Sequence, residues 1–328
     1  MENRILEIKQ MRTTFKTAKG PMEAIRGIDL HVDEGEILGI VGESGSGKSV
    51  TMKSVMRLLP TYAKITAEDI LYKGENILEM SEKELQKFRG NEMAMIFQDP
   101  MTAMNPLHKV GYHLIQVIRR YKKCSKQEAE KIGIEMLRQV GIPTPEARMN
   151  QYPHEFSGGM RQRALIAMAL SCEPSLLIAD EPTTALDVTI QAQILELLKK
   201  LHDERNMSIV IISHDMGVMA SMCDRIVVMY GGIIVEEGTV DEIFYHAKHP
   251  YTKALLKSIP HPERSKGTKL QGIDGAPPSL YNLPEGCPFA ERCPIATKRC
   301  RMEMPEFIVN SETHRTKCFC NVEKGETE

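Results

Sequence analysis

The stretch Gly42-Glu43-Ser44-Gly45-Ser46-Gly47-Lys48-Ser49 decides the fold of this 328-residue chain. It follows a short apolar run at residues 36–41 and precedes a segment that has helical spacing until Pro60. We therefore predict a strand, a glycine-rich loop and a helix that begins near Lys48 and runs toward Leu59. Glycines let backbone N–H groups turn inward around an anion, and the helix N-terminus adds its partial positive charge. The stretch thus predicts a phosphate-binding loop.

The side chains of this loop suit a nucleoside triphosphate. The pattern G-x-x-x-x-G-K-[ST] directs the ammonium of Lys48 to the β- and γ-phosphates and the hydroxyl of Ser49 to Mg²⁺. A glycine-rich turn that binds nothing is the alternative, but the flanking strand and helix favour the phosphate loop. The predicted nucleotide contacts in this region are Gly42, Ser44, Gly45, Gly47, Lys48, Ser49 and Val50.

Two acids follow a second buried-type strand, which we expect over residues 175–179. Ligands of α/β sheets bind at the carboxyl ends of strands. Asp180 is predicted to hold Mg²⁺, usually through water, and Glu181 to polarise the water that attacks the γ-phosphate. An apolar run with two acids is a weak signal by itself and gains force from the phosphate loop upstream. His214 ends the next expected strand, residues 208–212, and is predicted to lie near the γ-phosphate; a structural or solvated histidine is the alternative.

Strands alternate with helices along the chain, which predicts an α/β core with a largely parallel sheet. A further strand is expected at residues 93–97, and Gly231-Gly232 predicts a two-residue hairpin between two strands. Thr239 and Glu242 predict a capping box before a late helix. The remaining expected elements are helices over residues 113–140, interrupted at Cys124-Ser125, over 160–170 and over 190–205, and the hairpin strands 225–230 and 233–237.

Composition and charge exclude some classes of function. The net charge is −2, so nothing indicates a nucleic-acid partner held by bulk charge. No apolar run approaches the roughly 18–20 residues of a membrane span, and the first ten residues lack the apolar segment of a signal peptide. We expect the chain to stay in the cytoplasm, so that any contact with the membrane comes through a partner.

Five of the eight cysteines crowd the end of the chain. In a cytoplasmic protein such a cluster indicates a metal site before it indicates disulfides. Cys287, Cys293 and Cys300 are separated by five and six residues, and Cys318 follows after seventeen more. This spacing contains none of the short Cys-x₂₋₄-Cys pairs common in zinc sites, whereas an iron–sulfur cluster tolerates wider loops. An iron–sulfur cluster, a zinc ion and a set of free thiols all remain open.

The segment Phe156-Ser157-Gly158-Gly159-Met160-Arg161-Gln162-Arg163 resembles the signature motif of ABC ATPases. Its serine could also simply cap a helix. However, the phosphate loop, Gln98, this segment, the acidic strand, Thr184-Ala185-Leu186-Asp187 and His214 follow one another in the order and spacing of that family. The resemblance covers residues from about 4 to 260, and more loosely the tail.

The resemblance implies roles for several residues. Gln98 would contact Mg²⁺ and sense the transmembrane partner. Ser157, Gly158 and Gly159 would face the γ-phosphate of ATP bound to the opposite subunit of a dimer. Asp187 would link the two sites, and Phe15 would stack on adenine, although residues 16–22 form an apparent insertion after it.

Several details resemble the ATPases of peptide and nickel importers. These are Phe156 and Met160 in the signature, the run from Gln98 to Pro106, and the tail segments Gly286-Cys287-Pro288-Phe289 and Arg292-Cys293-Pro294. The closest resemblance is to the first ATPase subunit of dipeptide and oligopeptide importers.

That family implies a complete importer. Its partners would be a second, different ATPase chain, two permease subunits and an extracytoplasmic binding protein, with no nucleic acid. The chain would lie peripherally on the cytoplasmic face of the cell membrane and bind ATP and Mg²⁺. The tail would hold a [4Fe-4S] cluster, with zinc as the alternative, through Cys287, Cys293, Cys300 and Cys318.

The expected fold is an ABC-type nucleotide-binding domain over residues 1–260. It would comprise a core around the phosphate loop, a helical subdomain at about residues 99–172 and an N-terminal antiparallel β region. A small Cys-rich extension would follow over residues 261–328.

Two other classes of function compete with the transporter motor. A soluble ABC ATPase of DNA repair would carry a long coiled-coil insertion, and one of translation would usually carry two ATPase modules. A purely regulatory nucleotide-binding protein would lack the catalytic base, and Glu181 argues against it. The sequence therefore favours an ATP-hydrolysing transport motor.

Overall fold

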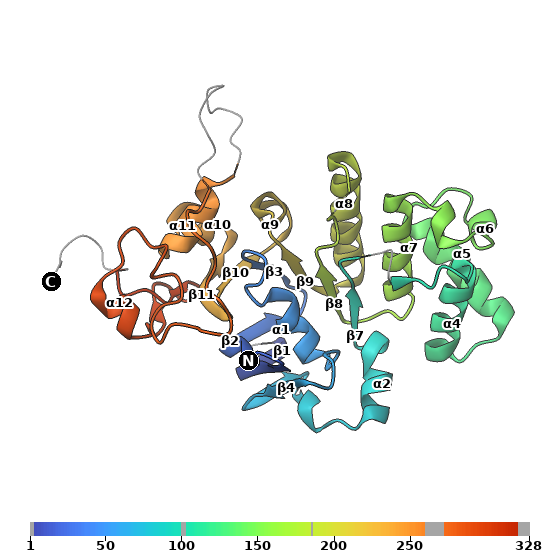
Figure 1. Ribbon diagram of the computed structural model, residues 1–328. Coiled ribbons are helices and arrows are strands. Elements are labelled where there is room, and N and C mark those ends of the chain that lie inside the picture. Colours follow the sequence, from blue (N-terminus) through green and yellow to red (C-terminus); the bar gives the residue numbers. More distant parts are fainter. Residues whose placement is uncertain (1–2, 100–102, 185, 260–271, 321–328) are drawn as a thin grey trace. The chain divides into compact units, whose positions relative to one another are not determined.

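The computed structural model describes residues 3–99, 103–184, 186–259 and 272–320 (Figure 1). Parts of two quoted motifs, Pro100 to Thr102 and Ala185, and the expected boundary at residues 260 and 261 lie outside this range. The chain forms two compact units. The first unit consists of Met1–Ile5, Asp33–Glu36 and Ile77–Ile212, and the second of Leu6–Val32, Ile37–Asn76 and Ser213–Glu328.

The first unit contains three parallel strands, with β8 between β7 and β9. They are β7 (Met93–Ile96), β8 (Leu176–Asp180) and β9 (Ser208–Ser213), and all of their residues are buried. Such continuous apolar runs are typical of parallel strands that are covered on both faces. The three strands confirm the predictions for residues 93–97, 175–179 and 208–212 to within one residue at each end.

Helices make up most of the remainder of the first unit. The predicted break at Ser125 is confirmed, since its side chain caps α5 and pairs reciprocally with Glu128 in a capping box. The expected helical region near residues 99–172 contains α4 to α7. The elements are η1 (Ile77–Glu79), α2 (Glu82–Asn91), α4 (Val110–Lys122), α5 (Lys126–Gln139), α6 (Pro145–Arg148), η2 (Pro153–Glu155), α7 (Gly158–Leu170) and α8 (Val188–Arg205).

The N-terminal strands of the second unit form the expected antiparallel sheet. Its strand order is β2-β1-β5-β6, and β4 also pairs with β1. Buried and exposed residues alternate along much of β1, as on a sheet with one covered face. The strands are β1 (Arg4–Thr17), β2 (Gly20–Asp33), β4 (Ala63–Thr66), β5 (Asp69–Tyr72) and β6 (Glu75–Asn76).

The other strands of the second unit pair in mixed directions. β3 (Ile37–Val41) runs parallel to β10 (Arg225–Tyr230), and β10 pairs antiparallel with β11 (Ile233–Thr239). The predicted hairpin is confirmed, because Gly231 and Gly232 both adopt positive φ angles at its turn. Two tail strands, β12 (Ile308–Val309) and β13 (Arg315–Thr316), extend this set on β11. The expectation of a largely parallel sheet holds for the pairs β3–β10, β7–β8 and β8–β9, while the predicted hairpin and the tail strands add antiparallel pairs.

The helices of the second unit are short. α1 (Lys48–Val55) ends before the predicted Leu59, because Arg57 turns the chain with a φ of 50°. The capping box of Thr239 and Glu242 is confirmed at the start of α10. The others are α9 (Met216–Met222), α10 (Val240–His246), α11 (Pro250–Lys257) and α12 (Lys298–Met302).

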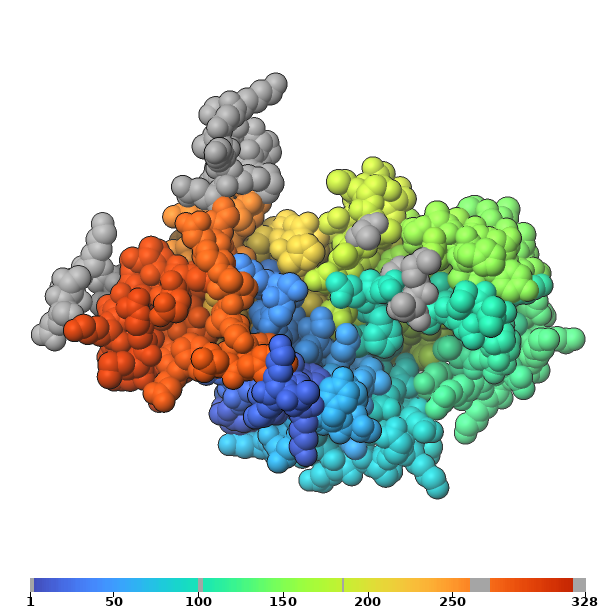
Figure 2. Space-filling view, viewed as in Figure 1, coloured from blue at the N-terminus to red at the C-terminus, as the bar shows by residue number. Residues whose placement is uncertain are grey.

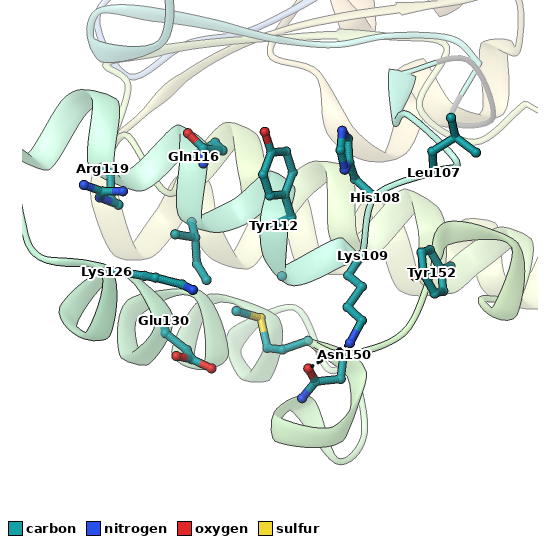
Figure 3. A pocket seen from close by; sticks show the side chains of 13 residues that line it. Leu107, His108, Lys109, Tyr112, Gln116, Arg119, Lys126, Glu130, Asn150 and Tyr152 are labelled. Atoms are coloured by element: carbon teal, nitrogen blue, oxygen red, sulfur yellow. Dashed lines mark hydrogen bonds between the residues drawn. The ribbon is translucent and has the colours of Figure 1, made fainter.

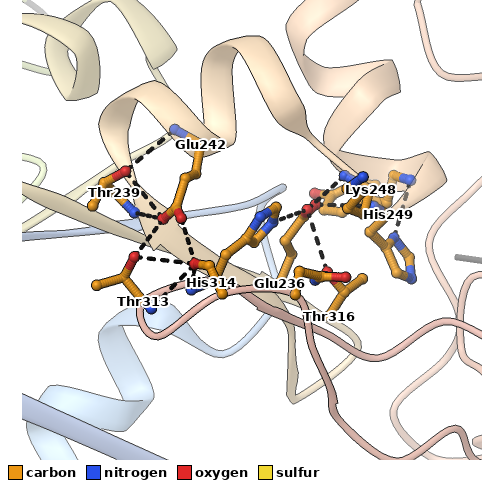
Figure 4. Close-up of polar contacts among 11 residues, drawn as sticks. Glu236, Thr239, Glu242, Lys248, His249, Thr313, His314 and Thr316 are labelled. Atoms are coloured by element: carbon orange, nitrogen blue, oxygen red, sulfur yellow. Dashed lines mark hydrogen bonds and ion pairs between the residues drawn. The ribbon is translucent and has the colours of Figure 1, made fainter.

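Buried polar contacts anchor the tail within the second unit (Figure 4). Nε2 of His314 lies 2.8 Å from Oε1 of Glu236, and both side chains are inaccessible to solvent. The hydroxyls of Ser311 and Thr313 donate to the carboxylate of Glu242 over 2.6 and 2.8 Å. Side-chain hydrogen bonds therefore join the β12–β13 segment to β11 and α10, in addition to the pairing of β13 with β11.

The tail also contacts the N-terminal strands. Arg315 donates to the carbonyl of Asp29 over 3.1 Å, and Arg26 donates to the carbonyl of Pro284 over 3.2 Å. In Figure 2 the tail, coloured orange to red, accordingly lies against the blue N-terminal strands. The described tail residues thus pack with the strands of the second unit, while the proposed domain boundary near residue 260 stays a prediction. Within the described residues, no helix has the length and apolar character that a bilayer crossing requires.

Candidate functional site

The phosphate loop lies between β3 and α1, as predicted. The ammonium of Lys48 is buried and donates to the carbonyls of Gly42 and Glu43 over 2.7 and 3.0 Å. Ser44 and Gly45 are exposed at the tip of the loop, and Ser49 and Val50 are half-buried in the first turn of α1. The loop therefore surrounds the ammonium group of Lys48 and exposes its tip to solvent.

Two of the loop's glycines are required by space. A Cβ on Gly42 would lie 2.2 Å from the carbonyl oxygen of Met229, and one on Gly47 would lie 2.7 Å from Cδ1 of Ile25. Both residues also adopt positive φ angles. Among the described residues, the buried Oγ of Ser46 has no hydrogen-bond partner. A buried ammonium, a polar atom without a partner and a helix N-terminus fit the phosphates of a nucleotide.

The acid after β8 is held in place by two side chains. Nε2 of Gln98 donates to Oε2 of Glu181 over 2.9 Å, and Oγ1 of Thr184 donates to the same oxygen over 2.8 Å. Glu181 has a φ of 47°, an uncommon conformation for a non-glycine residue that concentrates at functional sites. Asp180, one residue earlier, is fully buried. The structure thus brings Gln98 and Glu181 into contact, while their roles toward Mg²⁺ and water stay predictions.

The signature segment starts a helix. Ser157 is exposed and caps α7 by accepting from the N–H of Met160 over 3.3 Å. Gly158 is exposed, while Gly159 is buried, and a Cβ on Gly159 would lie 2.7 Å from Cγ2 of Ile190. An exposed helix N-terminus with a serine and a glycine suits an anion presented from outside the chain.

The three other residues predicted to contact nucleotide or link the two sites differ in solvent exposure and in their contacts. Asp187 is exposed and caps α8 by accepting from the N–H of Ile190 over 2.9 Å. His214 is exposed directly after β9. Phe15 is half-buried on β1, with its ring 6.1 Å from that of Tyr62.

Strand geometry indicates which way Phe15 faces. Side chains two residues apart on a strand share a face. Thr13, on the same face as Phe15, hydrogen-bonds to Ser54 of α1 over 2.8 Å. Phe15 therefore lies on the side of β1 that faces α1, the helix that follows the phosphate loop. Tyr62, which is 55% exposed, is a second aromatic that sequence reasoning missed.

The five tail cysteines line one small cavity. Cys287, Cys293, Cys300, Cys318 and Cys320 surround it together with His249 and Phe289. No cysteine in the described residues forms a disulfide. Within the same residues, no three His, Cys, Asp or Glu side chains are grouped so as to hold a metal ion. Sequence reasoning thus identified the cysteines that converge on this cavity, and a ligand role for any of them stays a prediction.

Burial dominates the acid–base behaviour of this cavity. It raises the pKa of Cys287 to about 11 and that of Cys318 to about 12, and the neighbouring cysteines add to both shifts. It also lowers the pKa of His249 to about 4. Free thiols here are therefore protonated at neutral pH, and a metal would have to displace their protons.

Sequence reasoning missed two contacts of the predicted site residues, one in each unit. Thr184 was quoted as part of a motif but given no role, and it holds Glu181. Arg292 was quoted as part of a tail motif, and its guanidinium binds the carboxylate of Glu43 in the phosphate loop over 2.6 and 3.0 Å. A charged residue at the second position of such a loop was the only signal that could have suggested a partner.

Solved structures share this fold. The dimeric structure of MJ0796, a bacterial ABC transporter cassette, matches with a TM-score of 0.64 at 30% identity and covers 72% of this chain and 98% of that one. A post-hydrolysis state of the same cassette bound to ADP and Pi matches with a TM-score of 0.62 at 29% identity, with the same coverage. Residues 25–184 match the ABC transporter family. Fold and site together define an ABC-type ATPase.

More specific relatives cover nearly the whole chain. Residues 235–300 match the family described as oligopeptide/dipeptide transporter, C-terminal region. The oligopeptide transport ATP-binding protein OppD of Bacillus subtilis (strain 168) is 54% identical over 96% of this chain and 88% of its own length. The dipeptide transport ATP-binding protein DppD of the same strain is 49% identical over 98% and 96%. The chain therefore belongs to the family of ATP-binding subunits of oligopeptide and dipeptide ABC transporters.

Proposed function

We propose that this chain is the ATP-hydrolysing motor of an importer for dipeptides or oligopeptides. The observation that carries the proposal is the placement of Glu181, whose carboxylate is held by Gln98 and Thr184 at the end of β8. An oriented carboxylate of this kind can polarise a water molecule for attack on phosphorus. The relatives named above are described as ATP-binding proteins of oligopeptide and dipeptide transport.

The binding residues follow from the chemistry of the two units. In the second unit, the backbone N–H groups of the phosphate loop and the ammonium of Lys48 would hold the phosphates, and Ser49 would contribute an oxygen ligand to Mg²⁺. In the first unit, Asp180 and Gln98 supply further oxygen atoms of the kind that Mg²⁺ prefers. Mg²⁺, when bound, neutralises developing charge on the phosphates. His214 and Phe15 are proposed to contact the γ-phosphate and the adenine.

Dimer closure is the proposed mechanical step. Ser157 and Gly158 are exposed at the start of α7, where they could meet a nucleotide held by another ATPase subunit. Asp187 is exposed at the start of α8 and could link the two sites. ATP would favour the closed dimer and hydrolysis the open one, so that the nucleotide biases a two-state equilibrium. The family resemblance implies a second, different ATPase chain, and we propose a heterodimer.

The permease would bind the helical part of the first unit (Figure 3). There α4, α5 and the segment before α4 form an open pocket of about 570 Å³. Leu107 is 81% exposed at its rim, and Tyr112 is 46% exposed and stacks on His108 at a centroid distance of 4.2 Å. Exposed apolar and aromatic side chains around a hollow are typical of a protein-binding surface. We propose that a cytoplasmic segment of one of two permease subunits binds here, which would place the chain on the cytoplasmic face of the membrane.

The cysteine-lined cavity is proposed to hold a [4Fe-4S] cluster. Its donor set suits this group, because several thiols face one enclosed space and cluster ligands lie farther apart than the ligands of a single ion. Cys287, Cys293, Cys300 and Cys318 are the proposed ligands, and zinc is the alternative. Anaerobically purified protein should contain iron and acid-labile sulfide; a colourless preparation with one zinc per chain would decide for zinc.

Peptide uptake tests the proposed function directly. A strain that lacks this chain should lose uptake of labelled di- and tetrapeptides, and the wild-type chain should restore it. The restored chain should copurify from the membrane with a second ATPase and two permeases. A soluble ATPase of another process would leave peptide uptake intact and would purify without membrane proteins.

A further inference from the structure

The guanidinium of Arg292 is fully engaged in hydrogen bonds. Its Nη atoms bind both oxygens of Glu43, its Nη1 also donates to Oη of Tyr230 over 3.1 Å, and its Nε and Nη2 donate to the carbonyls of Asp274 and Ile273 over 2.9 and 3.0 Å. The side chain is 5% exposed. A planar, bidentate and buried contact of this kind fixes both position and orientation.

Glu43, the partner of Arg292, is the second residue of the phosphate loop. Its N–H donates to Oη of the buried Tyr251 over 2.8 Å. Its carbonyl accepts from Nζ of Lys48 over 3.0 Å and from the N–H of Ser46 over 3.2 Å. The backbone carbonyl of Glu43 thus accepts a hydrogen bond from Lys48, the lysine that is expected to bind phosphate. A shift of the Glu43 side chain would therefore move the Lys48 ammonium as well.

The contact between Arg292 and Glu43 also neutralises a negative charge in the phosphate loop. A carboxylate in a loop that binds a polyanion opposes binding unless a cation neutralises it. The carboxylate of Glu43 is neutralised by Arg292, which comes from the tail and lies 249 residues away in the sequence. The tail therefore supplies the cation that neutralises this carboxylate.

We infer that Arg292 is a positioning residue for nucleotide binding, acting through Glu43, so that the Cys-rich tail sets the affinity of the phosphate loop. This inference rests on the proposed nucleotide-binding role of that loop. Arg292 is bonded directly to Cys293, which lines the cysteine cavity. The peptide bond between Arg292 and Cys293 and the side chain of Arg292 thereby connect the position of the cysteines in the cavity to the phosphate loop.

A double-mutant cycle on the full-length chain, purified anaerobically, tests the inference. The dissociation constant of a fluorescent ATP analogue is measured for wild type, Arg292→Ala, Glu43→Gln and the double variant. Arg292→Ala should weaken binding about tenfold, because an uncompensated carboxylate stays in the loop. The same change in the Glu43→Gln background should alter binding by less than about twofold, since the charge that it neutralises has gone.

Two further variants separate positioning from general damage to the tail. Arg292→Lys keeps the charge but loses the bidentate geometry, and should restore part of the affinity. Arg301→Ala is the matched control, because Arg301 pairs with Glu291 at the surface and is 54% exposed. It should bind nucleotide like wild type. In the assembled transporter, Arg292→Ala should raise the KM for ATP about tenfold and change kcat by less than about threefold, since Glu181 is untouched.

The outcomes are distinct. If wild type fails to bind nucleotide, the proposed role of the loop is wrong. If wild type binds and Arg292→Ala binds within about twofold of it, the inference is overturned. It is also overturned if the effects of Arg292→Ala and Glu43→Gln multiply independently in the double variant, because Arg292 would then act other than through Glu43.

Discussion

The buried carboxylate of Glu236 on β11 binds His314 of the tail (Figure 4). The substitution His314→Ala removes this contact between the tail and β11. Burial alone would raise the pKa of Glu236, but hydrogen bonds from His314 and from the N–H groups of Lys248 and His249 outweigh it and lower the pKa. Glu236 is therefore ionised in the folded protein at neutral pH. His314→Ala leaves that charge buried with fewer donors.

The expected cost follows from the donors that remain. The two backbone N–H groups, at 2.6 and 3.0 Å, still bind Glu236 in the variant. Loss of one charge-assisted hydrogen bond costs about 1.5–3 kcal/mol, less than the roughly 3–5 kcal/mol for stripping a buried charge of its only partner. We therefore predict a local destabilisation of about 2–3 kcal/mol for His314→Ala.

Hydrogen exchange of the tail measures this cost locally. The N–H of Lys317 donates to the carbonyl of Val235 over 2.8 Å, next to the perturbed pair. A loss of about 2–3 kcal/mol should speed exchange at this amide and in β13 roughly 30- to 150-fold. His314→Gln, which can still donate, should lie between. His246→Ala, a change at an exposed histidine of α10, should leave exchange unchanged. Wild-type exchange rates in His314→Ala would refute the reasoning.

Three further predictions concern separate regions. Hydrogen bonds from Ser311, Thr239 and Thr313 outweigh burial and hold the pKa of Glu242 at about 2. A lowered pKa stabilises the folded state above the ordinary value of 4.5, so the thermal-midpoint difference between wild type and Glu242→Gln should be full at pH 7 and vanish as pH falls toward 2. Cys287→Ser should lower metal content per chain, measured by elemental analysis, whereas Cys172→Ser should not; equal losses would contradict the proposed ligands. Lys48→Ala should weaken ATP binding at least about tenfold by titration, because the buried ammonium is lost.

The local features of the fold were predictable from the sequence. The phosphate loop, the hairpin at Gly231-Gly232 and the capping boxes of Ser125 and Thr239 depend on residues a few positions apart, and each is where the pattern placed it. Element ends were less predictable. The early end of α1 depends on the left-handed conformation of Arg57, which nothing in its residue type signals.

Contacts between distant segments could not be read from the sequence. The pairing of Gln98 with Glu181 requires β7 and β8 to be neighbours, which no local pattern in the sequence indicates. The charge of Glu43 in the phosphate loop suggests some partner, but no local pattern indicates Arg292, which lies 249 residues away in the sequence. Residues 261–285 are rich in proline, glycine and charge, which predicts either a linker or an irregular wrap. In the described part, residues 272–285, carbonyls accept hydrogen bonds from Arg26 and Arg292, so this part is an irregular segment packed within the tail.

The role of Glu181 as the group that activates water is the central claim, and one substitution tests it most directly. Glu181→Gln keeps the shape and the contacts of the side chain but removes the charge that polarises water. In the assembled transporter the variant should bind ATP within about threefold of wild type and lose hydrolysis by at least about 100-fold, the range expected for a general base. Hydrolysis by Glu181→Gln at the wild-type rate would contradict this account.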